Sequence, residues 1–108
     1  MNAAERLWRG IARRDWEAVR AQFHASARVE RVATGERLDV DDYVAQLRVE
    51  AARGGGDVEV LRSVADGRTC VIEALVGARR CAGIYDLHDG RIAGAIEYWA
   101  QPPGGPGP

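Results

Sequence analysis

The sequence predicts an α+β protein in which three N-terminal helices pack against a strongly bent antiparallel sheet. In the first half of the chain, apolar residues recur at helical intervals. The second half contains three turn signals, Asp66-Gly67, Gly77-Ala78 and Asp89-Gly90, between four segments rich in β-forming residues. Both faces of these segments are largely apolar, so both faces of the sheet are expected to be covered.

The first two helices follow from apolar spacing and a capping residue. The first is predicted over residues 3–13, where Leu7, Trp8 and Ile11 share one face. Asp15 can cap the second, because its carboxylate can accept hydrogen bonds from the amides of the first turn. That helix should end near His24, with a buried stripe that consists of Trp16, Val19 and Phe23.

A short strand and a third helix complete the first half. The strand is predicted over residues 27–33 and stops at Thr34-Gly35. Asp39 is the expected N-cap of the third helix, which ends at the glycine run 54–56. The buried stripe of this helix is Tyr43, Val44, Leu47 and Ala51.

The four strands of the second half are predicted over residues 58–65, 68–76, 79–87 and 91–99, joined as a meander. In the second of them, Cys70, Ile72, Ala74 and Val76 lie opposite Thr69, Val71, Glu73 and Leu75. In the last, Ile92, Gly94, Ile96 and Tyr98 lie opposite Ala93, Ala95, Glu97 and Trp99. Three helices can cover only one face, so a second copy of the chain is expected on the other.

Composition indicates one soluble domain, residues 1–100, followed by a Pro/Gly-rich segment 101–108 that should be disordered. The net charge is −1 and no basic stripe is present, which argues against a nucleic-acid partner. No apolar run is long enough for a membrane span, and the charged N-terminus lacks a signal-peptide pattern. Cys70 and Cys81 have no metal or redox spacing, and two free thiols in a cytoplasmic protein are the simpler interpretation, with a disulfide as the alternative. No metal or cofactor is expected.

Two stretches carry a resemblance to a known family. RRDWEAVRAQFHASARV (residues 13–29) and GIYDLHDGRIAGAIEYW (83–99) resemble the nuclear transport factor 2-like superfamily, in particular its SnoaL-like polyketide-cyclase group. The resemblance covers about residues 3–101. It implies a cone-shaped fold around an apolar pocket and a homodimer formed through the outer face of the sheet. The expected interface residues are Cys70, Ile72, Ala74, Ile96 and Tyr98.

Known catalytic residues of this superfamily are mostly absent. The general base of ketosteroid isomerase falls at Arg31 and its oxyanion-hole Asp at Gly83, so that isomerase chemistry is not expected. Of the limonene epoxide hydrolase residues, the final-strand Asp falls at Glu97, but its Arg and second Asp fall at Glu73 and Leu75. Its Tyr and Asn fall at Val29 and Arg31. Epoxide hydrolysis of that type is therefore not expected either.

The resemblance also assigns the residues that face inward. Glu97, Arg31 and Glu73 are the candidate catalytic residues, and the candidate ligand pocket consists of Val29, Leu75, Cys81, Gly83, Tyr85 and Trp99. Two carboxylates close together in an apolar cavity favour acid–base chemistry, because both cannot ionise at low cost. Alternatively, Arg31 pairs with them in a purely structural ion pair or triad, or it binds an anionic ligand. Tyr85 either donates to a ligand oxygen or belongs to the core.

Two functions are consistent with these residues. The first is a homodimer that binds a small apolar molecule with a polar oxygen and acts as an isomerase, cyclase or hydrolase through Glu97 and Arg31. The second is a non-enzymatic ligand-binding or dimerisation module whose polar pocket residues only satisfy one another. The first predicts that Glu97 and Arg31 border the main cavity, because Ala93 and Ala95 leave open volume beside the carboxylate.

Overall fold

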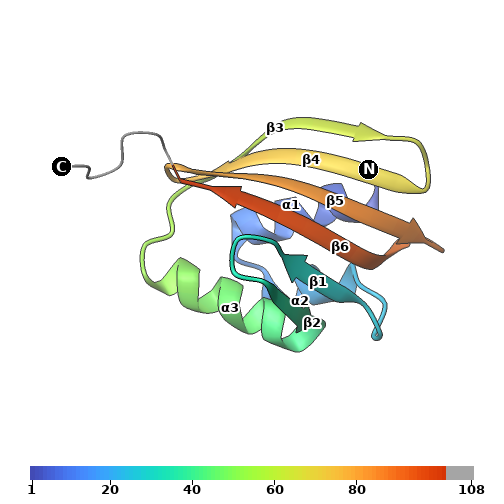
Figure 1. Cartoon of the computed structure of the whole chain (residues 1–108), viewed down its shortest axis with the longest axis horizontal. Coiled ribbons are helices and arrows are strands. Elements are labelled where there is room, and N and C mark those ends of the chain that lie inside the picture. The colour runs from blue at the N-terminus through green and yellow to red at the C-terminus, as the bar shows by residue number, and fades with distance from the viewer. Residues whose placement is uncertain (102–108) are drawn as a thin grey trace.

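The computed structural model describes residues 1–101 and contains a helical layer and one six-stranded sheet (Figure 1). The helices are α1 (Ala3–Arg13), α2 (Trp16–Ala21) and α3 (Val40–Ala52). The strands are β1 (Arg28–Arg31), β2 (Glu36–Asp39), β3 (Val58–Ala65), β4 (Thr69–Val76), β5 (Arg79–His88) and β6 (Arg91–Ala100). The predicted α+β class is confirmed. Apart from Gln101, the predicted disordered segment 101–108 lies outside the described residues.

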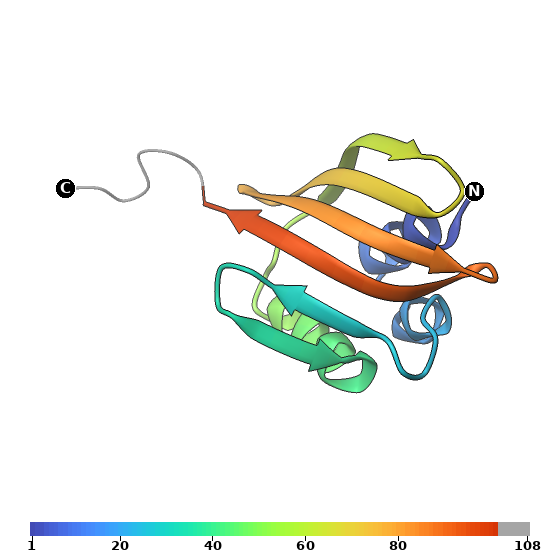
Figure 2. The same ribbon diagram turned by 45° about the vertical axis from the view of Figure 1, so that its right-hand side comes forward.

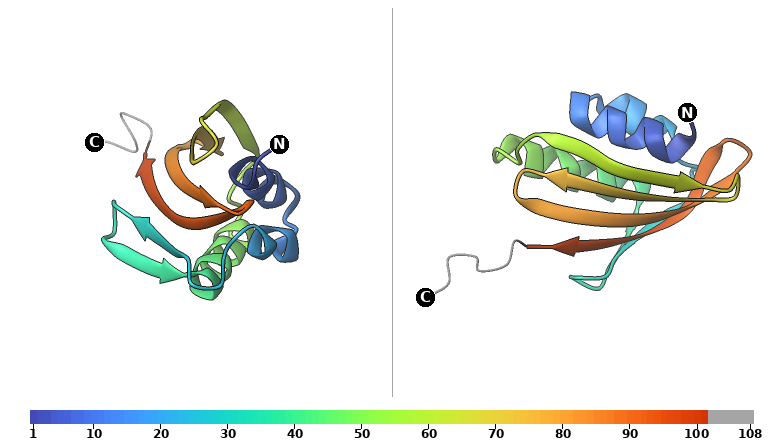
Figure 3. Two further views of the ribbon diagram at one scale, coloured as in Figure 1. Left: turned by 90° about the vertical axis from the view of Figure 1, so that its right-hand side faces the viewer. Right: turned by 90° about the horizontal axis from the view of Figure 1, so that it is seen from above.

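The strands form one curled sheet in the order β2-β1-β6-β5-β4-β3. The predicted meander is present in β3 to β6, whereas β1 pairs with β6 in parallel, so the sheet is mixed rather than wholly antiparallel. Figure 2 shows β1 and β2 extending the sheet beside β6. The sheet bends around the helices without closing into a barrel, as the end-on view in Figure 3 shows. This curl gives the sheet a concave face, which the helices occupy, and an outer face.

Local capping determines where the helices begin. Asn2 and Glu5 form a reciprocal capping box at α1, with both side chain–backbone distances at 2.9 Å. The predicted N-caps of the other helices are confirmed, because Asp15 accepts from the amide of Ala18 and Asp39 from that of Asp42. Among residues 1–101, no helix is long and apolar enough to cross a membrane.

Strand β2 is absent from the sequence-based prediction, which passes directly from Thr34-Gly35 to a helix. Its segment, Glu36–Asp39, has only one apolar residue, Leu38, and that residue is buried. The strand forms because it pairs antiparallel with β1 at the edge of the sheet. A polar edge strand of this kind has the composition of a loop, so tertiary pairing rather than apolar alternation determines its conformation.

The predicted faces of β4 are reversed in the structure. Cys70, Ile72 and Ala74, expected in a dimer interface, are fully buried on the concave face within the monomer. Their pairing partners on β5 are Tyr85, Gly83 and Cys81 in turn, which share that face. Glu73 and Leu75, expected in the pocket, therefore point to the outer face. Ile96 and Tyr98 do lie on the outer face, as predicted, and Tyr98 is 47% exposed.

A β-bulge changes the alternation of β6. The register between β5 and β6 pairs Asp86 with Gly94 and Leu87 with Ile92, which leaves Ala93 without a partner. Ile92 consequently turns into the core, although simple alternation predicts that it shares a face with Ile96. From Ala95 onward the strand keeps the predicted phase, and Ala95 and Glu97 are buried on the concave face.

Candidate functional site

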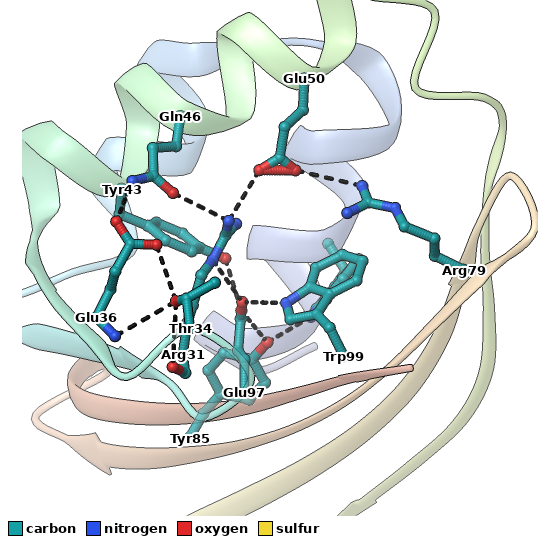
Figure 4. Close-up of polar contacts among 11 residues, drawn as sticks. Arg31, Thr34, Glu36, Tyr43, Gln46, Glu50, Arg79, Tyr85, Glu97 and Trp99 are labelled. Carbon is teal, nitrogen blue, oxygen red and sulfur yellow. Dashed lines mark hydrogen bonds and ion pairs between the residues drawn. The ribbon is translucent and has the colours of Figure 1, made fainter. Parts of the chain in front are cut away.

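Glu97 is fully buried at the centre of a polar network on the concave face (Figure 4). One carboxylate oxygen, Oε2, accepts hydrogen bonds from the hydroxyl groups of Tyr43 at 2.7 Å and Tyr85 at 2.9 Å. The other, Oε1, accepts from the indole nitrogen of Trp99 at 3.0 Å. Three neutral donors from α3, β5 and β6 thus replace the water that burial removes, and they satisfy the carboxylate without exposing it.

The network continues to α1 through Tyr85. The indole Nε1 of Trp8 donates to the Tyr85 hydroxyl at 2.8 Å. Because an indole nitrogen can only donate, the Tyr85 hydroxyl accepts from Trp8 and gives its own proton to Glu97. Gly83 makes this geometry possible: a Cβ atom at that position would lie 2.3 Å from the Tyr85 hydroxyl oxygen. The phenol ring occupies the space that a side chain at Gly83 would need.

The two tyrosines remain protonated donors at neutral pH. Burial raises the pKa of Tyr43 and Tyr85 well above the ordinary value, and the negative charge of Glu97 raises it further. A phenolate in contact with a carboxylate would place two negative charges side by side in a fully buried site. Both hydroxyl groups therefore donate to Glu97, and Glu97 accepts all of its hydrogen bonds.

Arg31 lies beside Glu97 because β1 and β6 pair these two residues directly. Its Nη1 donates to Gln46 Oε1 at 3.0 Å and to Glu50 Oε1 at 2.8 Å, while its Nε is 3.8 Å from Glu97 Oε1. Burial lowers the pKa of Arg31, but the hydrogen bond to Glu50 and the charges of Glu97 and Glu50 outweigh it, so the net shift is upward. The guanidinium group is permanently charged and already paired with two carboxylates.

Glu50 connects Arg31 to a second guanidinium group. Its Oε2 accepts from Nη2 of Arg79 at 3.2 Å, so one carboxylate on α3 bridges β1 and β5. Trp99 is in contact with both arginines: Cζ of Arg31 is 5.6 Å, and Cζ of Arg79 4.6 Å, from the centre of the indole ring. Figure 4 shows Arg31 and Arg79 reaching Glu50 from different sides. These cation–π contacts and the shared carboxylate fix the orientation of Trp99.

A cleft of about 360 Å³ opens between α1, α2, α3 and the start of β5. We call it the Trp cleft, because all three tryptophans of the chain line it. Its lining residues are Trp8, Ile11, Ala12, Arg14, Trp16, Leu47, Glu50, Ala51, Gly55, Gly56, Asp57, Val58, Val76, Arg79 and Trp99. The rings of Trp8 and Trp99, whose centres are 6.3 Å apart, separate the cleft from Glu97 behind them.

The predicted site residues fall into three places. Trp99 lines the Trp cleft. Val29, Arg31, Cys81, Gly83, Tyr85 and Glu97 are buried on the concave face behind it and do not line it, contrary to the expectation that Glu97 and Arg31 border the main cavity. The structure does not bring Glu73 and Leu75 to this site. Glu73 forms ion pairs on the outer face, with Arg80 at 3.1 Å and Arg62 at 3.7 Å.

Several residues of the site were not singled out from the sequence. Trp8, Trp16 and Tyr43 are interpreted there as core residues, whereas they donate to the network or line the cleft. Glu50 and Arg79 are not candidates at all. One signal does point to Glu50: it follows Tyr43 by two helical turns, and Gln46 lies between them on the same face of α3. Polar residues that continue a buried stripe indicate a polar site.

Comparison with known proteins identifies the fold. No family model and no curated protein matches the chain. An NTF2-like protein of unknown function from Burkholderia xenovorans is similar in structure, with 22% identity and a TM-score of 0.80 over 97% of this chain and 85% of the other. An epoxide hydrolase from M. tuberculosis has 23% identity and a TM-score of 0.67, over 91% and 80%.

A third similar structure is IdmH from Streptomyces antibioticus, provisionally assigned as a polyketide cyclase. It has 13% identity and a TM-score of 0.75, over 90% of this chain and 88% of the other. The chain thus has the nuclear transport factor 2-like fold, as the resemblance in sequence implies. This fold carries several unrelated activities, so function has to be inferred from the site.

Proposed function

We propose that the protein binds a small, largely apolar molecule in the Trp cleft. The observation that carries this proposal is the convergence of all three tryptophans, one each from α1, α2 and β6, on a single cavity. Tryptophan rings supply large rigid apolar surfaces, and leaving them around an open volume costs stability unless something fills it. A volume of about 360 Å³ suits a molecule of one to three rings.

The contacts of Glu97 favour a protein that binds its ligand without using Glu97 as a catalytic residue. The carboxylate accepts from three neutral donors, faces Arg31 and does not line the cleft. Trp8 and Trp99 stand between it and any ligand. A general base has to come within hydrogen-bond reach of its substrate, directly or through one water, which this enclosure opposes. We assign Glu97 and Arg31 the role of positioning Trp99 and Tyr85.

A second candidate function is acid–base catalysis by a different pair. Glu50 and Arg79 both line the Trp cleft, with side chains 27% and 30% exposed. They are a pocket carboxylate and an arginine, the pair that an isomerase, cyclase or hydrolase of this fold would need. This candidate requires that Glu50 leave its two arginine partners during turnover. Turnover of a bound molecule that Glu50→Gln abolishes and Glu97→Gln merely weakens would establish it.

We also propose that the protein is a homodimer formed through the outer face of the sheet. Pairing aligns Val64, Val71, Ile84 and Ile96 in one row across β3, β4, β5 and β6. Tyr98 lies on the same face one row away, beside Ala82. No helix of residues 1–101 covers this face (Figure 3). A continuous row of β-branched side chains there supports contact with an identical row, because two such rows are self-complementary about a twofold axis.

The binding proposal is tested with a cleft-filling variant. We expect the tryptophan fluorescence of the wild-type protein to change saturably on titration with 2-naphthalenemethanol. Ala51→Leu should weaken binding strongly, because Ala51 on α3 lines the cleft. Ala45→Leu is the matched control, since Ala45 is on the same helix, exposed and outside the cleft lining. Equal affinities of the two variants and the wild type, or no saturable signal, would reject the proposal.

A further inference from the structure

Two of the three tryptophans of the cleft, Trp8 and Trp99, present only their apolar rings to a ligand. The indole N–H of Trp8 is committed to Tyr85, and that of Trp99 to Glu97, both on the side away from the cleft. An indole has no other polar atom. At these two walls, a bound molecule therefore meets apolar ring surface only, and any polar atom of the molecule has to find its partner elsewhere.

The carboxylate of Glu50 is also committed. Its Oε1 accepts from Arg31 and its Oε2 from Arg79. The lining of the cleft contains two arginines, Arg14 and Arg79, and two carboxylates, Glu50 and Asp57, so overall charge does not select a ligand. Selection depends on which group faces the cleft with unused hydrogen-bonding capacity. Glu97 is fully buried, and the side chain of Arg31 is only 9% exposed.

Arg14 and Asp57 also line the cleft, but both are exposed, and none of the described residues binds the side chain of Arg14. Arg79 is the lining arginine that is half-buried and held in place by other residues, Glu50 and Trp99. It lines the cleft, its side chain is 30% exposed, and among the described residues it makes a single side-chain hydrogen bond, from Nη2 to Glu50. A guanidinium group has five N–H donors, so most of its fork is unused. Its Cζ lies over the indole ring of Trp99, 4.6 Å from the ring centre, and this contact restrains the guanidinium group. A planar anion that binds edge-on to this fork would place its own ring against the same indole wall.

We propose that the ligand of the Trp cleft is a planar aromatic acid, whose carboxylate binds the guanidinium group of Arg79 while its ring packs against the tryptophans. This inference rests on the proposed binding function and specifies its ligand class. Arg31, considered from the sequence as the anion-binding residue, is buried and does not line the cleft. Its Nη1 donates to Gln46 and Glu50, while Nε and Nη2 have no hydrogen-bond partner among the described residues. Arg79 takes over that role on the cleft side of Trp99.

The experiment compares 2-naphthoate with methyl 2-naphthoate by isothermal titration calorimetry at neutral pH. The two probes share the ring system, but only the first is an anion. We expect 2-naphthoate to bind the wild type about tenfold more tightly or better, the scale of a hydrogen bond between charged groups. Arg79→Gln should remove that preference and leave the ester within about twofold. Arg79→Lys keeps the positive charge but loses the paired N–H donors of the guanidinium group. It should therefore retain part of the preference for 2-naphthoate over the ester.

Arg80→Gln is the matched control. Arg80 is adjacent in sequence, but its side chain is on the outer face, paired with Glu73. It should leave both affinities unchanged. Equal binding of the two probes by the wild type, or a preference that survives in Arg79→Gln and Arg79→Lys, would overturn the acid assignment and leave the binding function in place. Failure of both probes to bind would reject the binding function itself. Circular dichroism melting of each variant confirms that it is folded, and Arg79→Lys carries the test if Arg79→Gln is not.

Discussion

The space beside Gly83 shows how one absent side chain organises the buried network. The ring of Tyr85 lies across this glycine, which lets its hydroxyl group reach both Glu97 and Trp8. Glycine normally weakens a strand, because it adds backbone entropy and contributes no packing. Here that cost is offset by the hydrogen bond from Tyr85 to the buried carboxylate of Glu97, because hydrogen bonds to charged groups are stronger than those between neutral groups.

Gly83→Ala should lower the free energy of unfolding by about 1–3 kcal/mol, the usual cost of overpacking a core. The new methyl group would displace the Tyr85 phenol from its two partners, and urea denaturation measures the change. Gly94→Ala on β6 is the matched control, because the nearest atom to a Cβ there is 3.9 Å away. Equal losses in the two variants would mean that the Tyr85 contact is unimportant.

Tyr43 makes the stability of the fold sensitive to alkaline pH. The pKa of Tyr43 is raised well above 10 by burial and by Glu97, so between the unfolded and the folded pKa only the unfolded chain loses this proton. Stability is therefore fully present below pH ~10 and falls above it, by about 1.4 kcal/mol per pH unit for this residue.

Tyr43→Phe should remove one such contribution and make the fall in unfolding free energy above pH ~10 shallower. At neutral pH the same variant should be less stable by about 1.5–3 kcal/mol, because Glu97 loses a donor. Tyr98→Phe, on the exposed outer face, serves as the control. Parallel alkaline slopes for the wild type and Tyr43→Phe would contradict the assignment.

At the scale of the elements, β4 shows where the sequence is informative and where it misleads. Its boundaries follow from the turns that flank it, but its two faces are almost equally apolar, so alternation does not choose between them. The two-residue turn at Gly77-Ala78 does choose, because it pairs Val76 with Arg79 and hence Ala74 with Cys81. Directly paired residues lie on the same face of a sheet. Because Cys81 faces the concave side, its partner Ala74 has to face that side as well.

The corrected orientation of β4 predicts opposite sensitivities for neighbouring residues. Ile72→Ala should destabilise the protein by about 2–5 kcal/mol, because Ile72 is fully buried. Val71→Ala should cost under about 1 kcal/mol in the monomer, because Val71 is 41% exposed on the outer face. Thermal denaturation of both variants at low protein concentration separates the two. If Val71→Ala destabilised the protein more than Ile72→Ala, the orientation of β4 predicted from the sequence would be the correct one.

The candidate site was predictable only in part, for a related reason. The position of Glu97 between apolar neighbours indicates a buried carboxylate, and the resemblance gives its direction. One of its donors, Tyr43, comes from a helix 54 residues away in the sequence, and no local pattern specifies which phenol or indole reaches the carboxylate. The cleft itself depends on how three helices meet the sheet. Tryptophans on a helical stripe look the same whether they fill a core or line an opening.

At the scale of the whole molecule, the proposed dimer places the outer face of the sheet in its interface. Val71→Arg should convert the proposed dimer to a monomer, because it places a charge in the middle of the Val64-Val71-Ile84-Ile96 row. The position is exposed in the monomer, so the fold should survive. Light scattering at micromolar concentration provides the measurement, with Val49→Arg on the exposed side of α3 as the control. A monomeric wild type would reject the proposed interface.

The parallel pairing of β1 with β6 also has a consequence for the order of folding. Arg28–Arg31 and the helices around it leave the ribosome long before Arg91–Ala100 is synthesised. Until then Val29 lacks Ala95, and the charge of Arg31 lacks Glu97. Loop closure over most of the chain has to precede these contacts, which makes folding slow. Because Trp99 of β6 lines the Trp cleft, the cleft is complete only once this strand has paired.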